Sequence, residues 1–219
     1  MPHITLVRHG QANTEARDEI SYDRLSDLGH QQARWLGHHM ETTADKFQRV
    51  YCGTLTRHIE TATSMGADRH ADIVRDPRLN EFAYFTLSRL MEEQHGLSVP
   101  SEREAFVEHL PTVLGAWERG EIEGAPESYA AFEARVRDAM EDVAAGQGRA
   151  LVVTSGGLIG MVLRQTLSLD IQGWAKMCLA IMNTSLHRWQ MVLDQPLLVQ
   201  FNAVPHLESP DRHFAQTHL

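Results

Sequence analysis

Short apolar runs alternate with longer stretches of helical periodicity along this chain, and that alternation predicts an α/β fold. The runs that predict strands cover residues 4–7, 49–52, 73–75 and 150–153. Apolar residues at three- and four-residue spacing predict helices that cover about 27–44 and begin near residues 55, 129 and 158. Late runs over 186–192 and 197–201 are typical of a hairpin. We therefore expect a mostly parallel sheet with helices on both faces.

Local signals set the expected boundaries of several elements. Ser26 and Ser128 stand at the N-cap positions of two predicted helices. Residues 11–23 are polar and lack an apolar period, which predicts a loop or a frayed turn. The residues from Pro205 onward are also polar, and we expect them to form a loosely held tail.

Residues 83–127 change character and predict a helical excursion over the core. Ser101 and Glu104 have the spacing of a capping box. Pro111 lies within the apolar face that follows, so we expect a kink or two shorter helices there. The segment holds nine glutamates and three arginines, a net charge of −6. We expect it to be an insertion within a single domain, residues 1–219, without a fold of its own.

Composition narrows the possible classes of protein. Of 219 residues, 42% are hydrophobic and 22% are charged, as in ordinary globular proteins. Twenty lysines and arginines against twenty-nine aspartates and glutamates give a formal charge of −9, which argues against a nucleic-acid or anionic-membrane partner. Cys52 and Cys178 lie far apart, so neither a disulfide framework nor a structural zinc site is expected. Without a membrane-spanning run or a signal-peptide pattern, the protein is predicted to be cytoplasmic. The sequence specifies no oligomeric state.

The candidate chemistry lies where predicted strands end. Arg8 and His9 follow the first strand, where α/β proteins often place functional residues. Arg57 is expected in the first turn of a helix, where it can join backbone N–H groups around an anion. Residues 154–157, Thr-Ser-Gly-Gly, form a small-residue turn between a strand and a helix, which directs bare amides at a phosphate. Glu81, next to an apolar residue, would have a raised pKa and could protonate a leaving alkoxide.

These residues together suit a phosphoryl group. Two guanidiniums can bind its oxygens, and a neutral imidazole is a competent nucleophile at physiological pH. The set is complete without a metal, and no metal or other cofactor is expected. Taken alone, His9 would more often be a buried structural histidine near a strand end, and Ser155 could be only a small residue that permits the turn.

The segment Leu6-Val7-Arg8-His9-Gly10-Gln11 resembles the signature of the histidine phosphatase superfamily, which includes the cofactor-dependent phosphoglycerate mutases. Further segments are similar to the motifs that follow in that family, and they occur in the family's order. They are Leu25-Ser26-x-x-Gly29-x-x-Gln32-Ala33, Leu55-x-Arg57-x-x-x-Thr61-Ala62, Leu79-Asn80-Glu81-Phe82 and Val152-Val153-Thr154-Ser155-Gly156-Gly157.

The resemblance implies a phosphoglycerate mutase-like, three-layer α/β/α sandwich in which His9 becomes phosphorylated. Arg8 and Arg57 would hold the phosphoryl oxygens, and Glu81 would be the proton donor. The family normally has a second catalytic histidine at the position of Ser155. A serine hydroxyl can still donate one hydrogen bond, so Ser155 and Gly156 are expected to bind phosphate. Candidates to replace the missing histidine are His58 and His206.

The function that follows is a metal-independent phosphomonoesterase that acts through a phosphohistidine on a small phosphorylated metabolite or a phosphoprotein. Ser155 could lower its activity, since loss of one electrostatic donor costs about 10²- to 10³-fold in rate. A phosphoglycerate-type mutase is one alternative, which the excursion's negative charge disfavours. A weakly active or inactive phosphatase-like binding or regulatory module is the other.

Overall fold

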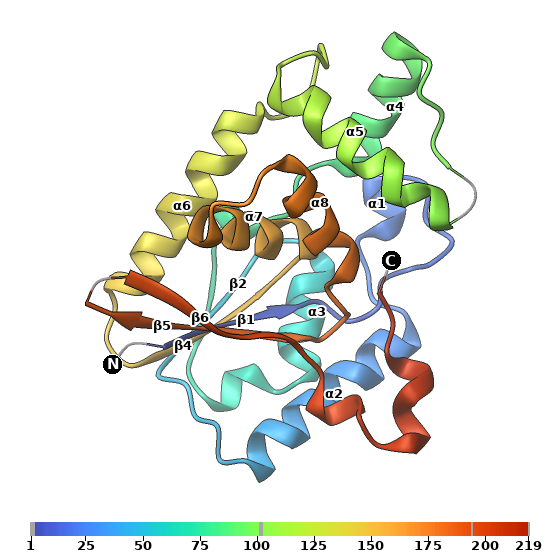
Figure 1. Ribbon diagram of the computed structural model, residues 1–219. Helices are drawn as coiled ribbons and strands as arrows, with labels where there is room; N and C mark the ends of the chain where they lie inside the picture. Colours follow the sequence, from blue (N-terminus) through green and yellow to red (C-terminus); the bar gives the residue numbers. More distant parts are fainter. Residues whose placement is uncertain (1–2, 101–102, 194, 219) are drawn as a thin grey trace.

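A six-stranded sheet forms the centre of the computed structural model, which describes residues 3–100, 103–193 and 195–218 (Figure 1). The strand order is β3-β2-β4-β1-β5-β6. The first four strands in this order are parallel, β5 is antiparallel to β1, and β6 is antiparallel to β5. The strands are β1 (His3–Arg8), β2 (Arg49–Cys52), β3 (Ile73–Arg75), β4 (Arg149–Thr154), β5 (Leu186–Val192) and β6 (Gln195–Ala203). The predicted strands and hairpin are therefore confirmed.

The register of the parallel strands brings their carboxyl ends to one edge of the sheet. Arg8 pairs with Thr154, and Cys52 pairs with Val153. The His9 backbone amide continues this ladder by donating to the Thr154 carbonyl at 2.8 Å. The segments after β1, β2 and β4 consequently leave the sheet close together.

Helices cover both faces of the sheet. Their bounds are α1 (Glu19–Tyr22), α2 (Asp27–Thr42), α3 (Thr56–Ser64), α4 (Tyr84–His95), α5 (Phe106–Glu118), α6 (Tyr129–Ala145), α7 (Gly156–Leu167) and α8 (Ile171–Ala180). Ser26 and Ser128 cap α2 and α6 by accepting from the Gly29 and Ala131 amides, as predicted. Among the described residues, none of these helices has the length and apolar character to cross a membrane.

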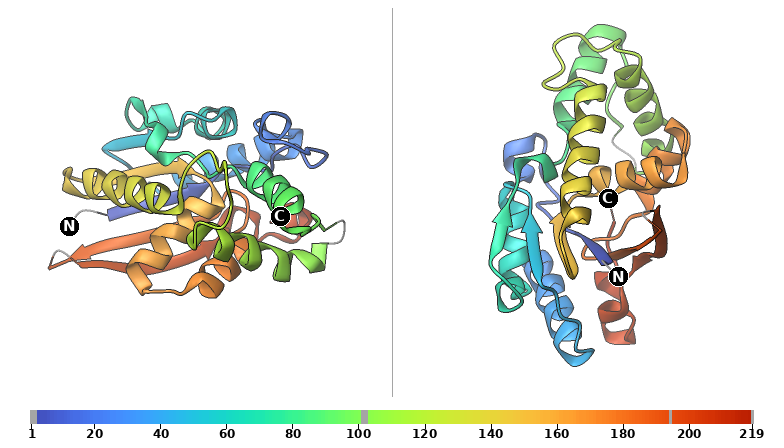
Figure 2. Two further views of the ribbon diagram at one scale, coloured as in Figure 1. Left: turned by 90° about the horizontal axis from the view of Figure 1, so that it is seen from above. Right: turned by 90° about the vertical axis from the view of Figure 1, so that its left-hand side faces the viewer.

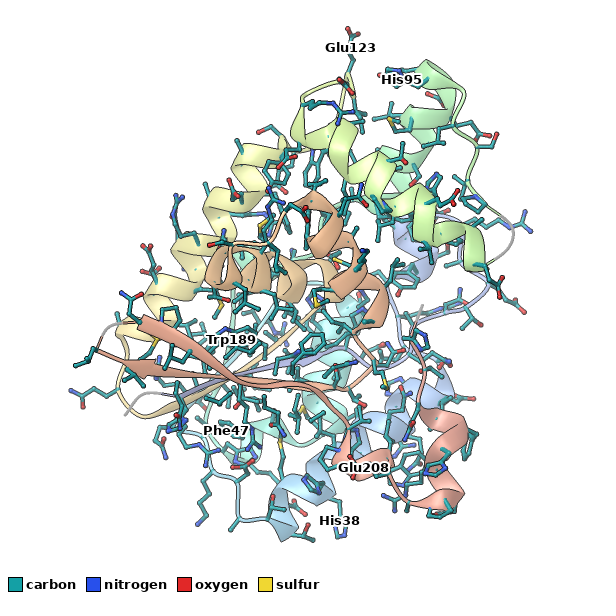
Figure 3. The ribbon with its side chains drawn as sticks, in the orientation of Figure 1. His38, Phe47, His95, Glu123, Trp189 and Glu208 are labelled. Atoms are coloured by element: carbon teal, nitrogen blue, oxygen red, sulfur yellow. The ribbon has the colours of Figure 1, made fainter. Side chains whose placement is uncertain are left out.

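Successive side chains of the central strands point to opposite faces of the sheet and belong to two separate hydrophobic cores. Leu151 and Val153 pack with α2 and α3, whereas Ala150 and Val152 join a larger cluster with α4 to α8. Figure 3 shows Trp189 and Phe47 on opposite sides of the sheet, one in each cluster. This is the predicted three-layer α/β/α arrangement, because successive side chains of a strand point to opposite faces.

The excursion supplies α4 and α5, which rise beyond the sheet in Figure 2. Pro111 does not divide α5: one helix continues through it, so the predicted split into two shorter helices is wrong. Buried apolar contacts of Leu110, Val113 and Trp117 hold this helix against the larger core and outweigh the lost backbone hydrogen bond. Ser101 of the predicted capping box lies outside the described residues.

The carboxyl-terminal segment is not the loosely held tail that its polarity predicts. It forms short 3-10 turns over Pro205–Leu207 and Pro210–Ala215, and Leu207 and Ala215 are fully buried. The buried Gln32 side chain donates to the Ala215 carbonyl at 2.7 Å and to Thr217 Oγ1 at 2.9 Å. Helix α8 was also absent from the sequence prediction. Both elements contribute residues to the candidate site.

Candidate active site

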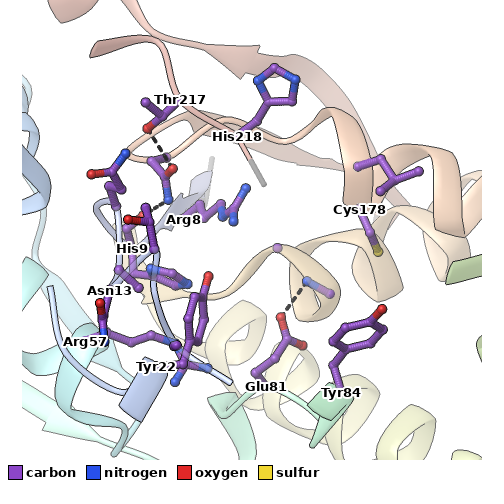
Figure 4. A pocket seen from close by; sticks show the side chains of 18 of the residues that line it. Arg8, His9, Asn13, Tyr22, Arg57, Glu81, Tyr84, Cys178, Thr217 and His218 are labelled. Carbon is purple, nitrogen blue, oxygen red and sulfur yellow. Dashed lines mark hydrogen bonds between the residues drawn. The ribbon is translucent and has the colours of Figure 1, made fainter. Parts of the chain in front are cut away.

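A cavity of about 570 Å³ opens where the parallel strands end (Figure 4). Arg8 enters it from the last position of β1 and His9 from the residue that follows. Arg57 comes from α3, Glu81 from the loop after β3, and Gly156 from the start of α7. Helices α1, α4, α5 and α8 and the carboxyl-terminal segment supply other parts of the wall. The fold therefore brings five of the residues singled out in the sequence to one cavity.

His9 is held as a neutral imidazole with a defined tautomer. Its Nδ1 lies 2.7 Å from the Gly10 carbonyl oxygen, which can only accept a hydrogen bond, so Nδ1 carries the proton. Nε2 then keeps its lone pair. Burial, together with the charges of Arg57 and Arg8, holds the pKa of His9 well below its ordinary value. A buried neutral imidazole with a free Nε2 lone pair is what nucleophilic attack requires.

Arg8 is a buried cation that forms no ion pair with a carboxylate of the described residues. The residue is 5% exposed, and Nη1 donates to the Ile181 carbonyl. In the part of the chain that the structure describes, Nε has no hydrogen-bond partner and no carboxylate pairs with the guanidinium. A buried charge without a partner is costly, so this guanidinium is suited to an anion that enters the cavity.

Arg57 is buried too, but it is anchored by a residue that the sequence did not single out. Its Nη1 lies 2.9 Å from Asp23 Oδ1. Asp23 also accepts from the Thr56 amide at 2.9 Å, so one carboxylate fixes both the arginine and the start of α3. The Tyr22 ring lies 5.0 Å from the guanidinium carbon. The only sequence signal for Asp23 was its place in the polar segment 11–23.

Glu81 has the environment of a proton donor. Its Oε2 accepts from the Gly157 amide at 2.7 Å, and Oε1 accepts from the Phe82 amide at 3.2 Å. Burial raises the pKa of the carboxyl group, although these backbone hydrogen bonds oppose the shift. In Figure 4 the carboxyl group lies between Tyr22 and Tyr84, with the Gly157 hydrogen bond drawn as a dashed line.

Gly157 is required for the position of Glu81. A Cβ atom at residue 157 would lie 2.4 Å from Glu81 Oε1 and 2.3 Å from the Phe82 ring. Phe82 is packed against Trp117, Phe132 and Trp174 and cannot move aside. We expect Gly157→Ala to displace the carboxyl group and to lower kcat for an alkyl phosphate by about 10²-fold, as for loss of a general acid.

Gly156→Ala is the matched control for this prediction. A Cβ atom at residue 156 would meet nothing closer than 3.6 Å, and its nearest neighbour would be Arg8 Nε. Steady-state kinetics of the two variants should therefore differ by more than tenfold in kcat. Equal activity of the two alanine variants would show that Gly157 does not position the acid.

Ser155 and His58 contact each other behind the cavity wall. Ser155 Oγ lies 2.6 Å from His58 Nε2, and both residues are buried. Neither belongs to the cavity lining. The centre of the His58 ring lies 5.8 Å from that of His9. Burial and the charge of Arg57 hold the pKa of His58 well below its ordinary value, so the ring is neutral.

His206 is placed elsewhere, so its predicted role beside Ser155 is wrong. Its Nε2 lies 2.8 Å from Thr184 Oγ1, and its ring lies 6.5 Å from that of His39 on α2. The turn at Pro205–Leu207 directs this side chain into the α2 side of the molecule and away from the cavity.

Two further residues support the site without having been predicted. Asn183 donates from Nδ2 to the His9 carbonyl at 3.1 Å, and Thr217 donates from Oγ1 to Asn183 Oδ1 at 2.9 Å. Both line the cavity, and Thr217 is the residue that Gln32 holds. The carboxyl-terminal segment is thereby linked to the backbone of His9. No local sequence pattern marks these contacts.

The described residues contain no cluster of three or more His, Cys, Asp or Glu side chains arranged to hold a metal ion. The groups at the cavity can bind an anion between two guanidiniums, present a nucleophilic nitrogen to it, and deliver a proton from a carboxylic acid. Those are the requirements for phosphoryl transfer to histidine.

Comparison with known proteins gives one family and several similar folds. The model of the histidine phosphatase superfamily (branch 1) matches residues 4–204. No curated protein sequence matches the chain. Among solved structures, Bacillus stearothermophilus YhfR is 19% identical with a TM-score of 0.69, and the match covers 95% of this chain and 100% of that chain.

Two other solved structures illustrate the range of proteins with this fold. A phosphoglycerate mutase from Bacillus anthracis str. Sterne is 19% identical with a TM-score of 0.68, covering 93% of this chain and 94% of that chain. A phosphoserine phosphatase from Entamoeba histolytica in complex with 3-phosphoglyceric acid is 17% identical with a TM-score of 0.66. The match covers 94% of this chain and 100% of that chain. The shared fold accommodates both a mutase and a phosphatase.

Proposed function

The chain belongs to the histidine phosphatase superfamily, and from this premise we propose that it is a metal-independent phosphomonoesterase that works through a phosphorylated His9. The observation that carries the proposal is the neutral His9 ring, protonated at Nδ1, beside the buried and uncompensated Arg8. Arg8 and Arg57 bind the phosphoryl oxygens. Gly156, at the start of α7, offers its backbone amide to the same group.

The reaction has two steps. The Nε2 lone pair of His9 attacks phosphorus, the bond to the ester oxygen breaks, and Glu81 gives its proton to that oxygen as the alcohol leaves. Water then attacks the phosphohistidine while the Glu81 carboxylate takes one of its protons. The P–N bond breaks, its electron pair returns to Nε2, and inorganic phosphate is released with the acid form of Glu81 restored.

Rapid-quench experiments that stop the reaction in alkaline denaturant can test this route directly. Mixing the protein with a ³²P-labelled phosphomonoester for milliseconds should give a protein-bound label that is stable to base and labile to acid. Peptide mapping should place it on His9, and a chase with unlabelled substrate should release it as inorganic phosphate. Hydrolysis without any labelled protein would contradict a phosphohistidine route.

The products distinguish the two alternatives. A mutase would return the phosphoryl group to a second position on the same acid without releasing phosphate. We rank it lower because, among the described cavity residues, the arginines and lysines are Arg8 and Arg57 alone, and both are assigned to the phosphoryl group. A binding module would bind phosphate, as measured by calorimetry, without either turnover or labelling.

His58 is proposed to support the nucleophile in place of the family's second histidine. Its ring packs against His9 and occupies the space into which a longer side chain at residue 155 would extend, since Ser155 Oγ is only 2.6 Å from His58 Nε2. Ser155 then serves as a positioning residue that holds the neutral His58 ring, and direct contact of its hydroxyl with phosphate is not needed.

Substitutions at residues 155 and 58, alone and combined, test whether His58 occupies the space of the family's second histidine. Ser155→His alone should clash with His58 and lower kcat by about tenfold or more, as expected for overpacking of a buried site. Combining it with His58→Ala vacates that space, and the double variant should recover most of the activity. His58→Ala alone should remain impaired.

Inorganic phosphate inhibition provides the control. If Ser155 is a positioning residue, Ser155→Ala should lower kcat and leave the inhibition constant for phosphate unchanged. An increase in that constant would instead identify the hydroxyl as a phosphate ligand. A Ser155→His variant more active than the wild type would contradict the proposed use of the space by His58.

A further inference from the structure

The cavity wall away from the phosphoryl-binding residues is built largely from aromatic and aliphatic side chains. Most of them come from the excursion and from α8, which the structure places over the strand ends (Figure 1). These residues are Tyr22, Phe82, Tyr84, Phe85, Phe106, Leu110, Cys178 and Leu179. In Figure 4, Tyr84 and Cys178 lie across the cavity from His9 and Arg57, with Glu81 between them.

The aromatic rings form a continuous series that starts at the nucleophile. The ring centre of Tyr22 lies 6.0 Å from that of His9 and 5.6 Å from that of Phe85. Phe85 is 6.0 Å from Tyr84, which is 6.4 Å from Phe106. Tyr22, Tyr84, Phe85 and Phe106 are all only partly buried. A ligand in the cavity would therefore cover apolar surface that is otherwise in contact with water.

The charges of the cavity are unevenly placed. Arg8 and Arg57 belong with His9 at the phosphoryl end. The basic residues of the described lining are otherwise His9 itself and His218 in the carboxyl-terminal segment. Glu81 adds an acidic group at the centre of the cavity. In the lining that the structure describes, no third arginine or lysine remains for a carboxylate or a further phosphate on the substrate.

Several polar side chains in the lining are already bonded within the protein. The Tyr84 hydroxyl lies 3.1 Å from His109 Nδ1, Asn13 Nδ2 donates to the Ser21 carbonyl at 3.0 Å, and Gln216 Nε2 donates to the Leu207 carbonyl at 2.9 Å. Burial raises the pKa of the Cys178 thiol well above its ordinary value, so this side chain is neutral as well. Recognition of a hydroxyl-rich group would compete with these contacts.

We infer that the substrate is a phosphomonoester of an apolar, ring-bearing alcohol, whose phosphoryl group lies at His9 and whose ring packs against Phe85 and Phe106. The inference rests on the proposed phosphatase function and names its substrate class. Small phosphorylated carboxylic acids are disfavoured, because their second negative charge would be desolvated beside aromatic rings, and both arginines of the described lining are assigned to the phosphoryl group.

Phosphonates test the inference without requiring turnover, because their P–C bond is not hydrolysed. Calorimetry would compare 2-phenylethylphosphonate with methylphosphonate and 2-carboxyethylphosphonate. Burial of one phenyl group predicts that the first binds about 10- to 100-fold more tightly than methylphosphonate. The carboxylated compound should bind no more tightly than methylphosphonate. Equal or tighter binding of the carboxylated compound than of the phenyl compound would overturn the inference.

Aromatic variants locate the apolar subsite. Phe85→Ala and Phe106→Ala should each lower the affinity for 2-phenylethylphosphonate by about fivefold or more and leave that for methylphosphonate unchanged, because each removes part of the apolar contact. Phe214→Ala is the matched control, since this ring is 69% exposed and lies outside the cavity. Thermal melts would check that the variants are folded. A preference for the phenyl compound that survives in both cavity variants would contradict the assignment.

Hydrolysis of the corresponding phosphate esters tests the phosphatase activity separately from the substrate class. Release of phosphate from 2-phenylethyl phosphate in preference to 2-carboxyethyl phosphate supports both the phosphatase and its substrate class. Hydrolysis of both esters at equal rates retains the phosphatase but overturns the substrate class. Tight binding of the phenyl phosphonate without hydrolysis of any ester retains the apolar subsite and contradicts the phosphatase.

Discussion

Replacing His9 with alanine is expected to lower the turnover of phosphomonoesters by about 10⁴-fold or more, because the reaction loses the nitrogen that attacks phosphorus. Arg8 and Arg57 remain in place, so inorganic phosphate should still bind. Steady-state kinetics with p-nitrophenyl phosphate would measure the first effect, and calorimetry with phosphate the second. A loss of turnover with retained phosphate binding identifies a chemical role for His9 and not a structural one.

Two controls accompany this prediction. His38→Ala removes an exposed histidine on α2 and should leave activity unchanged. Circular dichroism and thermal unfolding should show that His9→Ala is folded, since its backbone hydrogen bond to Thr154 does not depend on the side chain. Turnover within tenfold of the wild type in folded His9→Ala would contradict the proposed mechanism.

Replacing Glu81 with glutamine should slow the release of alkyl alcohols by about 10²- to 10⁴-fold, the usual contribution of a general acid. The first step with p-nitrophenyl phosphate should be far less affected, because nitrophenolate leaves without a proton. Its hydrolysis still needs a base for the second step, so phosphoprotein should accumulate. Rapid-quench measurement of a nitrophenolate burst, followed by a slowed steady state, would show both effects in one experiment.

The pH dependence supplies an independent check on Glu81. Burial raises the pKa of its carboxyl group, and the acid form is active in the first step, so that step should slow as pH rises through this value. Protonation of His9 removes the nucleophile, and because the pKa of His9 is lowered, this loss of activity should occur only at a pH well below the ordinary pKa of histidine. In Glu81→Gln the alkaline decline of the first step should disappear, after correction for ionisation of the substrate. An unchanged alkaline decline would assign it to another group.

Much of the fold was predictable because its signals are local. The strand runs, the caps at Ser26 and Ser128, and the helical period of α2 and α6 are each contained within a few residues. A buried strand must be apolar and a helix end must satisfy its amides, whatever surrounds them. Of the two outcomes expected at Pro111, the division into two shorter helices was wrong, because distant packing contacts hold one helix together through the proline.

The site was predictable in part for a related reason. Arg8, His9, Arg57 and Glu81 lie at the ends of predicted elements, and parallel strands bring such ends together. The supporting contacts had no such signal. Asp23 reaches Arg57 across 34 positions, and Gln32 reaches Thr217 across 185. A contact between residues so far apart has no periodicity or spacing that a single sequence displays.

By itself, the sequence determined the alternation of strands and helices, the family, and the residue types available for phosphoryl chemistry, because each depends on the order of neighbouring residues. Only the tertiary structure decided that His58 and not His206 meets Ser155, that a polar terminal segment docks on Gln32, and that aromatic rings of the excursion line the cavity. These features depend on which surfaces are buried together, and burial is a property of the whole folded chain.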